Sequence, residues 1–333
     1  MNITVLGGSG FIGTRLVGAL QAAGHRVRIL DRRPSTAHPE LVVIGDVRDA
    51  AAVDAVLAHC DCVINLAAEH GDDVQPASLY FDVNVGGAEQ VVRAADAQGV
   101  RRIVFVSSVA VYGLEQPLAD ESSAIRPGND YGRSKAQAEA VYRGWAAQSA
   151  AQRSLVLLRP SVVFGEGNHG NVYNLIDHIR RHRFVMVGSG DNRKSIAYVG
   201  NLVDFILTRL DADPGTQLFN YADKPDPSTR ELVGRIRTLL PGHRRTRVHL
   251  PYAVALAAGY LFDAAARLSG RSLSISSTRV RKFCADTRIA TTALEREGFV
   301  ARVSIDEGLA RMIAHLRRHE PIAGDDAPPF PSA

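Results

Sequence analysis

Short apolar runs alternate with helical patterns along the first half of the chain. The runs are almost continuously hydrophobic, as expected of strands that are buried on both faces. They lie at 3–6, 27–30, 41–44, 62–66, 103–107 and 155–158. Helical segments between them include 11–23, which is followed by Gly24, and 50–59, which is preceded by Asp49 as a candidate N-cap. This alternation predicts an α/β fold with a doubly wound parallel sheet.

The pattern changes after Arg159-Pro160, where loops rich in glycine and asparagine and further helical segments replace the alternation. Residues 217–221 still predict one more strand. We therefore expect a first domain over 1–165 that includes this strand, and a smaller mixed lobe over 166–320 that is interleaved with it. Residues 321–333 are rich in proline and poor in aliphatic side chains, so we expect a mobile tail.

The composition is that of a globular protein. The chain has 333 residues, of which 46% are hydrophobic, and this length suits one large domain or a domain with a second lobe. The net charge is +4, and the basic excess is spread along the sequence as arginines and not gathered into a tail. Such a balance does not require nucleic acid as a partner and would equally suit a small anionic substrate.

Cysteine usage and the N-terminus both indicate the cytoplasm. The three cysteines, Cys60, Cys62 and Cys284, form no CxxC pair and have no matching histidine cluster, so we expect neither disulfides nor a metal site. The chain begins MNITVLGG and enters an apolar strand at once, without the features of an export signal. We therefore expect a cytoplasmic location.

The most apolar later stretch is 253–268. It is interrupted by Gly259, Asp263 and Arg267 and is too short to span a bilayer. We favour a packed amphipathic helix over an element that lies on a membrane surface, so a membrane surface is the less favoured partner.

The stretch VLGGSGFIG at 5–13 places three glycines three residues apart, after the first strand and at the start of the first helix. This spacing lets the backbone turn tightly and lets a pyrophosphate approach the amides of a helix N-terminus. The context predicts a dinucleotide-binding loop of the Rossmann type, formed by Gly7, Gly10, Phe11, Ile12 and Gly13.

Asp31 closes the second strand, roughly 20 residues beyond this loop, where a carboxylate can bind the adenosine ribose hydroxyls of NAD. Arg32 and Arg33 follow and could hold the extra phosphate of NADP. Because the Asp31 carboxylate would repel that phosphate, we favour NAD, with NADP as the alternative.

The stretch DYGRSK places Tyr131 and Lys135 four residues apart, on one face of a predicted helix. A phenol with a pKa near 10 is a poor base, but a nearby ammonium and an oxidised nicotinamide both favour its charged form. The chain has only four lysines against 35 arginines, so a lysine at this spacing is notable. The pair predicts proton transfer by Tyr131, assisted by Lys135. The fifth strand ends in VFVSSVAVYG, which delivers Ser107 and Ser108 to the edge of the sheet where such folds bind ligands.

The chain carries the motifs GxxGxxG, Gly45-Asp46-Val47, Asn65-Leu66-Ala67-Ala68 and YxxxK. With these motifs it resembles the extended short-chain dehydrogenase/reductases over about residues 1 to 315. This group contains NAD-dependent nucleotide-sugar epimerases and dehydratases. The resemblance implies that Asp46 and Val47 flank the adenine. It places Leu66, Ala67 and Ala68 near the pyrophosphate and the nicotinamide ribose. It also implies a possible homodimer, formed through the helix that carries Tyr131.

The same resemblance implies roles for the catalytic residues. Ser108 would bind the substrate hydroxyl, and Tyr131 would remove its proton while hydride leaves the same carbon for NAD. Lys135 would hold the tyrosine's charge and the cofactor ribose. The 4,6-dehydratases of this group carry an acid pair directly after the serine or threonine, but here the positions are Val109 and Ala110, so dehydration is disfavoured.

Substrate contacts are implied by two later segments. In GNHGNVYNLIDHI, Asn171 and Asn174 are candidate donors to a nucleotide. In VGSGDNRKSIAYVG, Lys194 stands where related enzymes have an arginine that grips a diphosphate, with Arg193 beside it. Val162 stands where many sugar-nucleotide epimerases have a substrate-binding asparagine, so the sugar cannot be read from these positions.

The hypothesis is an NAD-dependent nucleotide-sugar epimerase of the UDP-hexose 4-epimerase type. The alternative is an NAD(P)-dependent reductase or dehydrogenase of a keto or hydroxy group on a sugar nucleotide, or a dehydrogenase of the hydroxysteroid type. A cofactor-sensing binding protein is disfavoured, since such proteins usually lack the Tyr/Lys pair. A lipid-linked sugar at a membrane surface remains open, because the basic stretch 235–247 adjoins the apolar helix.

Overall fold

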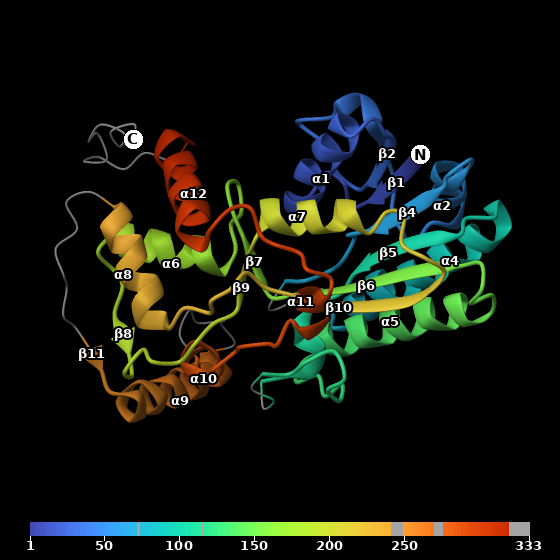
Figure 1. Ribbon diagram of the computed structural model, residues 1–333. Coiled ribbons are helices and arrows are strands. Elements are labelled where there is room, and N and C mark those ends of the chain that lie inside the picture. The colour runs from blue at the N-terminus through green and yellow to red at the C-terminus, as the bar shows by residue number, and fades with distance from the viewer. Residues whose placement is uncertain (72–73, 115, 117, 241–248, 270–275, 320–333) are drawn as a thin grey trace, which may run out of the picture. The chain divides into compact units, whose positions relative to one another are not determined.

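The computed structural model describes residues 1–71, 74–114, 116, 118–240, 249–269 and 276–319, and the chain divides into two compact units (Figure 1). The first unit contains Met1–Val163, Ala197–Ala222 and Ile289–Arg302. The second contains Phe164–Ile196, Asp223–Arg288 and the chain from Val303 onwards. The predicted tail at 321–333 and residues 241–247 of the basic stretch lie outside the described residues.

A seven-stranded sheet forms the centre of the first unit. Its strands are β1 (Asn2–Leu6), β2 (Arg26–Asp31), β3 (Val42–Ile44), β4 (Cys62–Asn65), β5 (Arg102–Val106), β6 (Ser154–Pro160) and β10 (Gly215–Tyr221). They lie in the order β10-β6-β5-β4-β1-β2-β3, and every pairing is parallel. The order reverses between β1 and β4, so the predicted doubly wound Rossmann sheet is confirmed.

The strand ends differ slightly from the sequence prediction. The run 41–44 becomes a strand only from Val42, because Pro39–Leu41 forms a 3-10 turn. The run 62–66 ends at Asn65, whose side chain then accepts a hydrogen bond from the Ala67 amide at 2.9 Å. The last strand, β10, begins two residues before the predicted segment.

Helices pack in two groups against this sheet. One group is α1 (Phe11–Ala22) and α7 (Val199–Thr208), which contact each other. The other is α2 (Ala50–Leu57), α4 (Gly87–Gln98) and α5 (Asp130–Ala147), which pack in that order. Val56, Val91 and Tyr142 from these three helices join Phe105 of β5 in one buried cluster. Burial of this cluster fixes α5, which carries the Tyr/Lys pair, against the sheet.

Side chains cap the helices that matter for the site. Asp49 caps α2 as predicted, accepting hydrogen bonds from the amides of Ala51 (2.9 Å) and Ala52 (3.4 Å). Asn129 caps α5 by accepting from the Gly132 amide at 2.8 Å. Shorter elements of this unit are α3 (Ser78–Phe81), a π-helix (Asp82–Gly86), a 3-10 turn (Val109–Tyr112) and α11 (Thr292–Arg296).

The second unit is mainly helical. Its helices are α6 (Asn171–Arg180), α8 (Thr229–Leu239), α9 (Tyr252–Ser269), α10 (Ser277–Cys284) and α12 (Ile305–His319). In this unit β8 (Met186–Val187) pairs with β11 (His249–Leu250). A second short sheet pairs β7 (Val162–Phe164) with β9 (Ile196–Tyr198), and each of these strands has residues in both units. In the described part of the chain, no helix has the length and apolar character needed to cross a membrane.

Candidate active site

The glycine loop joins β1 to α1. Among the described residues no side chain caps the first turn of α1, so its amides remain available to an anion. A Cβ added to Gly13 would lie 2.5 Å from the Gly7 carbonyl oxygen and 2.6 Å from the Gly8 Cα, so the helix packs directly on the loop backbone. This arrangement fits the pyrophosphate of a dinucleotide. The five residues predicted for this contact, Gly7, Gly10, Phe11, Ile12 and Gly13, all lie in this loop and first turn.

Asp31 lies at the end of β2 and connects that strand to the glycine loop. Its carboxylate accepts hydrogen bonds from the Ser9 amide at 3.0 Å and the Arg33 amide at 3.1 Å. The Arg32 guanidinium lies 3.9 Å from the carboxylate of Glu69. Because the Asp31 carboxylate would repel an additional phosphate and Arg32 lies close to the Glu69 carboxylate, the arrangement favours NAD over NADP.

Asp46 and Val47 follow β3. Both carboxylate oxygens of Asp46 bind the Arg48 side chain, at 3.0 Å to Nε and 2.7 Å to the terminal nitrogen, and these bonds lower the pKa of Asp46. Val47 is buried, and its side chain meets the α4 backbone at Gly87. The Asp46 carboxylate is thus ionised and held in a fixed position beside the carboxyl ends of β2 and β3.

Leu66, Ala67 and Ala68 follow β4 at the same edge of the sheet and are half-buried. The Leu66 amide donates to the Leu6 carbonyl at 2.9 Å, which continues the strand ladder. The side chain of Asn65 is fully occupied, since its Oδ1 accepts from Ala67 and its Nδ2 donates to the Tyr142 hydroxyl at 2.6 Å. This bond ties the segment to α5.

Ser108 and Tyr131 lie on two elements that contact each other, and the Ser108 side chain is close enough to the phenol to lower its pKa. Ser108 follows β5 and caps the next 3-10 turn, its Oγ accepting from the Ala110 amide at 3.1 Å. Tyr131 lies in the first turn of α5. The backbone of Gly132 packs directly against the 3-10 turn after Ser108, because a Cβ on Gly132 would lie 2.5 Å from the Ala110 carbonyl oxygen. Burial raises the pKa of Tyr131, and the Ser108 side chain opposes that rise.

Lys135 lies one turn further along α5, and only 1% of it is exposed. Its ammonium donates to the Val106 carbonyl at 2.7 Å and lies 4.2 Å from the centre of the Phe105 ring. Burial lowers the pKa of Lys135 to about 7, although the nearby Glu139 carboxylate raises it. The sequence led us to expect an ammonium that acts directly on the phenol. In the structure the Lys135 ammonium is bound to β5, and its action on the phenol stays a prediction.

Asn84 is a site residue that the sequence analysis did not identify. It lies in the π-helix Asp82–Gly86 and is buried. Its Oδ1 accepts from the Glu69 amide at 2.8 Å, and its Nδ2 donates to the Glu69 carbonyl at 3.0 Å and to the Ser134 hydroxyl at 2.9 Å. Ser134 in turn donates to the Tyr131 carbonyl at 2.9 Å. Asn84 therefore links the segment after β4 to the first turn of α5. The only signal in the sequence was an amide within an apolar helical pattern.

A buried polar network lies beside Lys135 on α5. Ser107 donates to Glu139 at 2.6 Å, so this serine supports α5 while Ser108 contacts Tyr131. Arg159 binds both oxygens of Glu139, at 2.8 Å and 2.5 Å, and donates to the Tyr112 hydroxyl at 2.7 Å. Glu139 comes four residues after Lys135, so a carboxylate on the same buried face of the helix was the available sequence signal.

Four of the candidate substrate residues belong to the second unit: Asn171, Asn174, Arg193 and Lys194. Asn171 and Asn174 lie in the first turn of α6, three residues apart on one face, and both are exposed. Val162, at the start of β7, is 36% exposed and supplies no hydrogen-bonding group.

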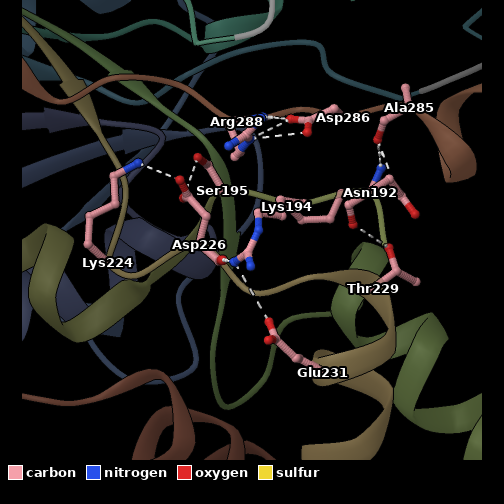
Figure 2. A network of polar contacts seen from close by, with 11 residues as sticks. Asn192, Lys194, Ser195, Lys224, Asp226, Thr229, Glu231, Ala285, Asp286 and Arg288 are labelled. Carbon is pink, nitrogen blue, oxygen red and sulfur yellow. Dashed lines mark hydrogen bonds and ion pairs between the residues drawn. The ribbon is translucent and has the colours of Figure 1, made fainter. Parts of the chain in front are cut away.

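Figure 2 shows Lys194 within the polar network of the second unit. The Lys194 ammonium donates to the carbonyls of Lys282 (3.0 Å) and Ala285 (2.6 Å), and burial lowers its pKa to about 8. Arg193 is exposed, donates to the Asp226 carbonyl at 2.8 Å and lies 3.8 Å from the Glu231 carboxylate. Lys194 therefore holds two segments of the chain together, and Arg193 is the better placed of the two to meet an anion.

Comparison with known proteins places this geometry in a family. The model of the NAD dependent epimerase/dehydratase family matches residues 3–222. An N-acetyl-alpha-D-glucosaminyl-diphospho-ditrans,octacis-undecaprenol 4-epimerase of Escherichia coli O157:H7 is 45% identical over 315 residues, which is 94% of this chain and 95% of that protein. A UDP-glucose 4-epimerase of Vibrio cholerae is 29% identical over 72% of this chain and 76% of its own length.

Solved structures agree with this placement. The structure of MoeE5 in complex with UDP-glucose and NAD has a TM-score of 0.75 and 26% identity, covering 96% of this chain and 99% of that chain. The family model spans the whole glycine loop, the Ser108/Tyr131/Lys135 cluster and the last strand of the sheet. The chain belongs to the NAD-dependent epimerase/dehydratase family.

Proposed function

We propose that this protein is an NAD-dependent 4-epimerase of a sugar that is joined to its carrier through a diphosphate. The observation that carries the proposal is the placement of Tyr131 beside Ser108, with Lys135 one turn further along the same helix. Its support from relatives is the 45% identity to an enzyme named as a 4-epimerase of a diphosphate-linked sugar. This agrees with the UDP-hexose 4-epimerase type that the sequence suggested, and leaves the carrier to be decided.

The residues divide the chemistry among them. Bound NAD would accept a hydride from the hydroxyl carbon and return it to the opposite face. Ser108 would hold the substrate hydroxyl, and Tyr131 would take the hydroxyl proton when hydride leaves and give it back when hydride returns. Lys135, bound to β5 beside the tyrosine, would supply positive charge that favours the phenolate.

The cofactor would bind along the carboxyl edge of the sheet. The N-terminus of α1 would hold its pyrophosphate, and Asp31 its adenosine ribose. Asp46 and Val47 would flank the adenine, and the segment 66–68 would line the nicotinamide half. A dehydratase role is not supported, because Val109 and Ala110 beside Ser108 provide neither an acid nor a base.

We propose a polyprenol as the carrier, with an N-acetylhexosamine as the sugar. The support is the similarity over nearly the whole chain to the undecaprenol-linked epimerase, against 29% identity over 72% of the chain to the UDP-glucose enzyme. Arg193 is the proposed contact to the diphosphate, and Asn171 and Asn174 are proposed contacts to the sugar. Lys194 supports the loop that carries Arg193. The homodimer indicated by the sequence stays a prediction.

The test compares three substrates: N-acetylglucosaminyl-diphospho-polyprenol with a short, water-soluble prenyl chain, UDP-N-acetylglucosamine and UDP-glucose. Both the epimeric sugar and the absorbance of reduced nicotinamide are followed. We expect epimer from the prenyl-linked substrate without net reduced cofactor, and no epimer from the Tyr131→Phe variant. Stoichiometric reduced cofactor would instead support the reductase or dehydrogenase alternative, including the hydroxysteroid type. Turnover of the UDP-sugars alone would contradict the polyprenol carrier.

A further inference from the structure

Helix α9 presents an apolar stripe to solvent. Val254 is 53% exposed and Leu261 is 72% exposed, the latter a high value for a leucine. Ala257 and Ala264 are also exposed and complete the stripe, because successive positions three and four residues apart lie on one face of a helix. The exposed face of α9 is therefore apolar along its described length.

The opposite face of the same helix is already occupied. Ala255 is buried, and the α9 backbone at Gly259 packs against Ser277 at the start of α10. The Asp263 carboxylate accepts a hydrogen bond from the Ser277 amide at 3.2 Å, so the acidic group of α9 is directed to α10. A surface helix is normally apolar only on its packed face, so a second apolar face indicates a second apolar environment.

Aromatic side chains border the stripe. Tyr260 (49% exposed) and Phe262 (40% exposed) flank Leu261, and Tyr252 (41% exposed) lies at the helix start. Tyr260 accepts a hydrogen bond from Arg281 of α10, whose guanidinium also lies 5.5 Å from the centre of the tyrosine ring. Aromatic rings with a polar end and a nearby cation are typical of the boundary between headgroups and acyl chains.

The basic excess of the protein is concentrated in the segment of the sequence that contains this helix, and is not spread evenly along the chain. Residues 235–284 contain ten arginines and lysines and a single acidic residue, Asp263. Because the whole chain has a net charge of only +4, the remainder of the chain is net negative. Among the described members of the segment, Arg279, Arg281 and Lys282 of α10 are all exposed.

We propose that α9 lies in the surface of an anionic bilayer, with its stripe at the acyl boundary and the basic residues of α10 among the lipid phosphates. An apolar helix face bordered by aromatic and basic side chains is the combination that binds such surfaces. Charge favours a membrane over a second copy of the chain, since a symmetric contact through α9 would bring two basic margins together. If the proposed function holds, a protein bound in this way would reach a substrate whose prenyl chain is embedded in the bilayer.

The experiment is flotation of the purified full chain with liposomes of phosphatidylcholine alone or with phosphatidylglycerol added. We expect flotation with the anionic vesicles, reduced at high salt and much weaker with the neutral vesicles. Leu261→Ser should lower the ratio of vesicle-bound to free protein about tenfold or more, because the substitution removes an apolar side chain that would be buried in the bilayer. Lys282→Gln should lower it about fivefold, and the loss should be abolished in high salt.

Matched control variants lie in the first unit. Val300 is 80% exposed, so Val300→Ser removes an equally exposed apolar side chain elsewhere and should leave flotation unchanged. The Arg302 side chain is 82% exposed, so Arg302→Gln is the corresponding control for charge. Equal losses in the variants and the controls would overturn the proposal. Failure of the wild-type protein to float would also overturn it. So would a Leu261→Ser variant that keeps flotation but changes from a dimer to a monomer in light scattering.

The two proposals fail in different ways. With the water-soluble prenyl substrate, Leu261→Ser should keep wild-type turnover, whereas with substrate embedded in anionic vesicles its turnover should fall in parallel with its flotation. A protein that floats but epimerises nothing would leave the membrane surface standing and remove the proposed function. A protein that epimerises the soluble substrate without floating would do the reverse.

Discussion

Arg159 and Glu139 form an ion pair inside the first unit, in which the side chains are 2% and 1% exposed. Glu139 lies on α5 one turn beyond Lys135, and Arg159 lies on β6, so the pair joins the catalytic helix to the sheet. Glu139 also accepts a hydrogen bond from Ser107 and interacts with the Lys135 ammonium, and Arg159 also donates to the Tyr112 hydroxyl. Loss of one partner would leave a charge in the protein interior.

We expect Glu139→Gln to lower the free energy of unfolding by about 3–5 kcal/mol, measured by urea denaturation. The matched control is Glu307→Gln on α12, which breaks the exposed pair with Arg311 and should change stability by less than about 1 kcal/mol. Equal effects of the two substitutions would show that the buried pair is not a determinant of stability.

Tyr131→Phe removes the hydroxyl that lies beside Ser108 and leaves the ring in place. We expect kcat to fall by at least about a hundredfold, with NAD binding nearly unchanged in a fluorescence titration. Tyr80→Phe is the control, because its ring lies 6.4 Å from that of Tyr131 and its hydroxyl binds the Gly71 carbonyl. Substantial turnover in the Tyr131 variant would remove the assignment of this residue.

The buried ammonium of Lys135 predicts a stability that depends on pH. Its pKa in the folded protein is about 7, below the usual 10.5, so between these pH values the unfolded chain holds a proton that the folded chain lacks. The free energy of unfolding should therefore rise with pH over this window, by about 2 kcal/mol between pH 7 and 9. Relative to wild type, Lys135→Met should lack this rise. A constant difference between the two proteins would show that Lys135 stays charged.

Two glycines of α1 provide a paired test of the cofactor loop. Gly13→Ala places a methyl group against the Gly7 and Gly8 backbone and should cost about 1–3 kcal/mol, with weaker NAD binding. Gly18→Ala meets nothing closer than 3.8 Å and should stabilise the helix by about 0.5–1 kcal/mol. Thermal unfolding and NAD titration of both variants would separate the loop contact from helix propensity.

The sheet was predictable because its strands are buried on both faces and read as continuous apolar runs. Their ends were less predictable, since they depend on local hydrogen bonds such as the one by which Asn65 takes over the ladder after β4. Tyr131 and Lys135 were found because one helix fixes their spacing. Asn84 was missed because it contacts Ser134, 50 residues away, and the sequence does not show that contact.

The spacing of residues along the chain also does not predict where the side chains of loop residues point. The sequence did not show that the Lys194 ammonium binds two backbone carbonyls of the same unit, so its predicted contact with a diphosphate stays a prediction. For α9 the apolar pattern predicted a packed helix. Only the exposed fractions of Val254 and Leu261 reveal that one face is packed and the other is not.

The contact between Gly132 and the Ala110 carbonyl makes the distance from Tyr131 to Ser108 a property of the main chain. Side-chain changes elsewhere in the protein can alter what is bound without moving these two hydroxyls apart. A new sugar or a new carrier could thus be acquired through residues such as Arg193 or Val162, while the reacting groups keep their spacing. The geometry of the reaction and the choice of substrate are then inherited separately.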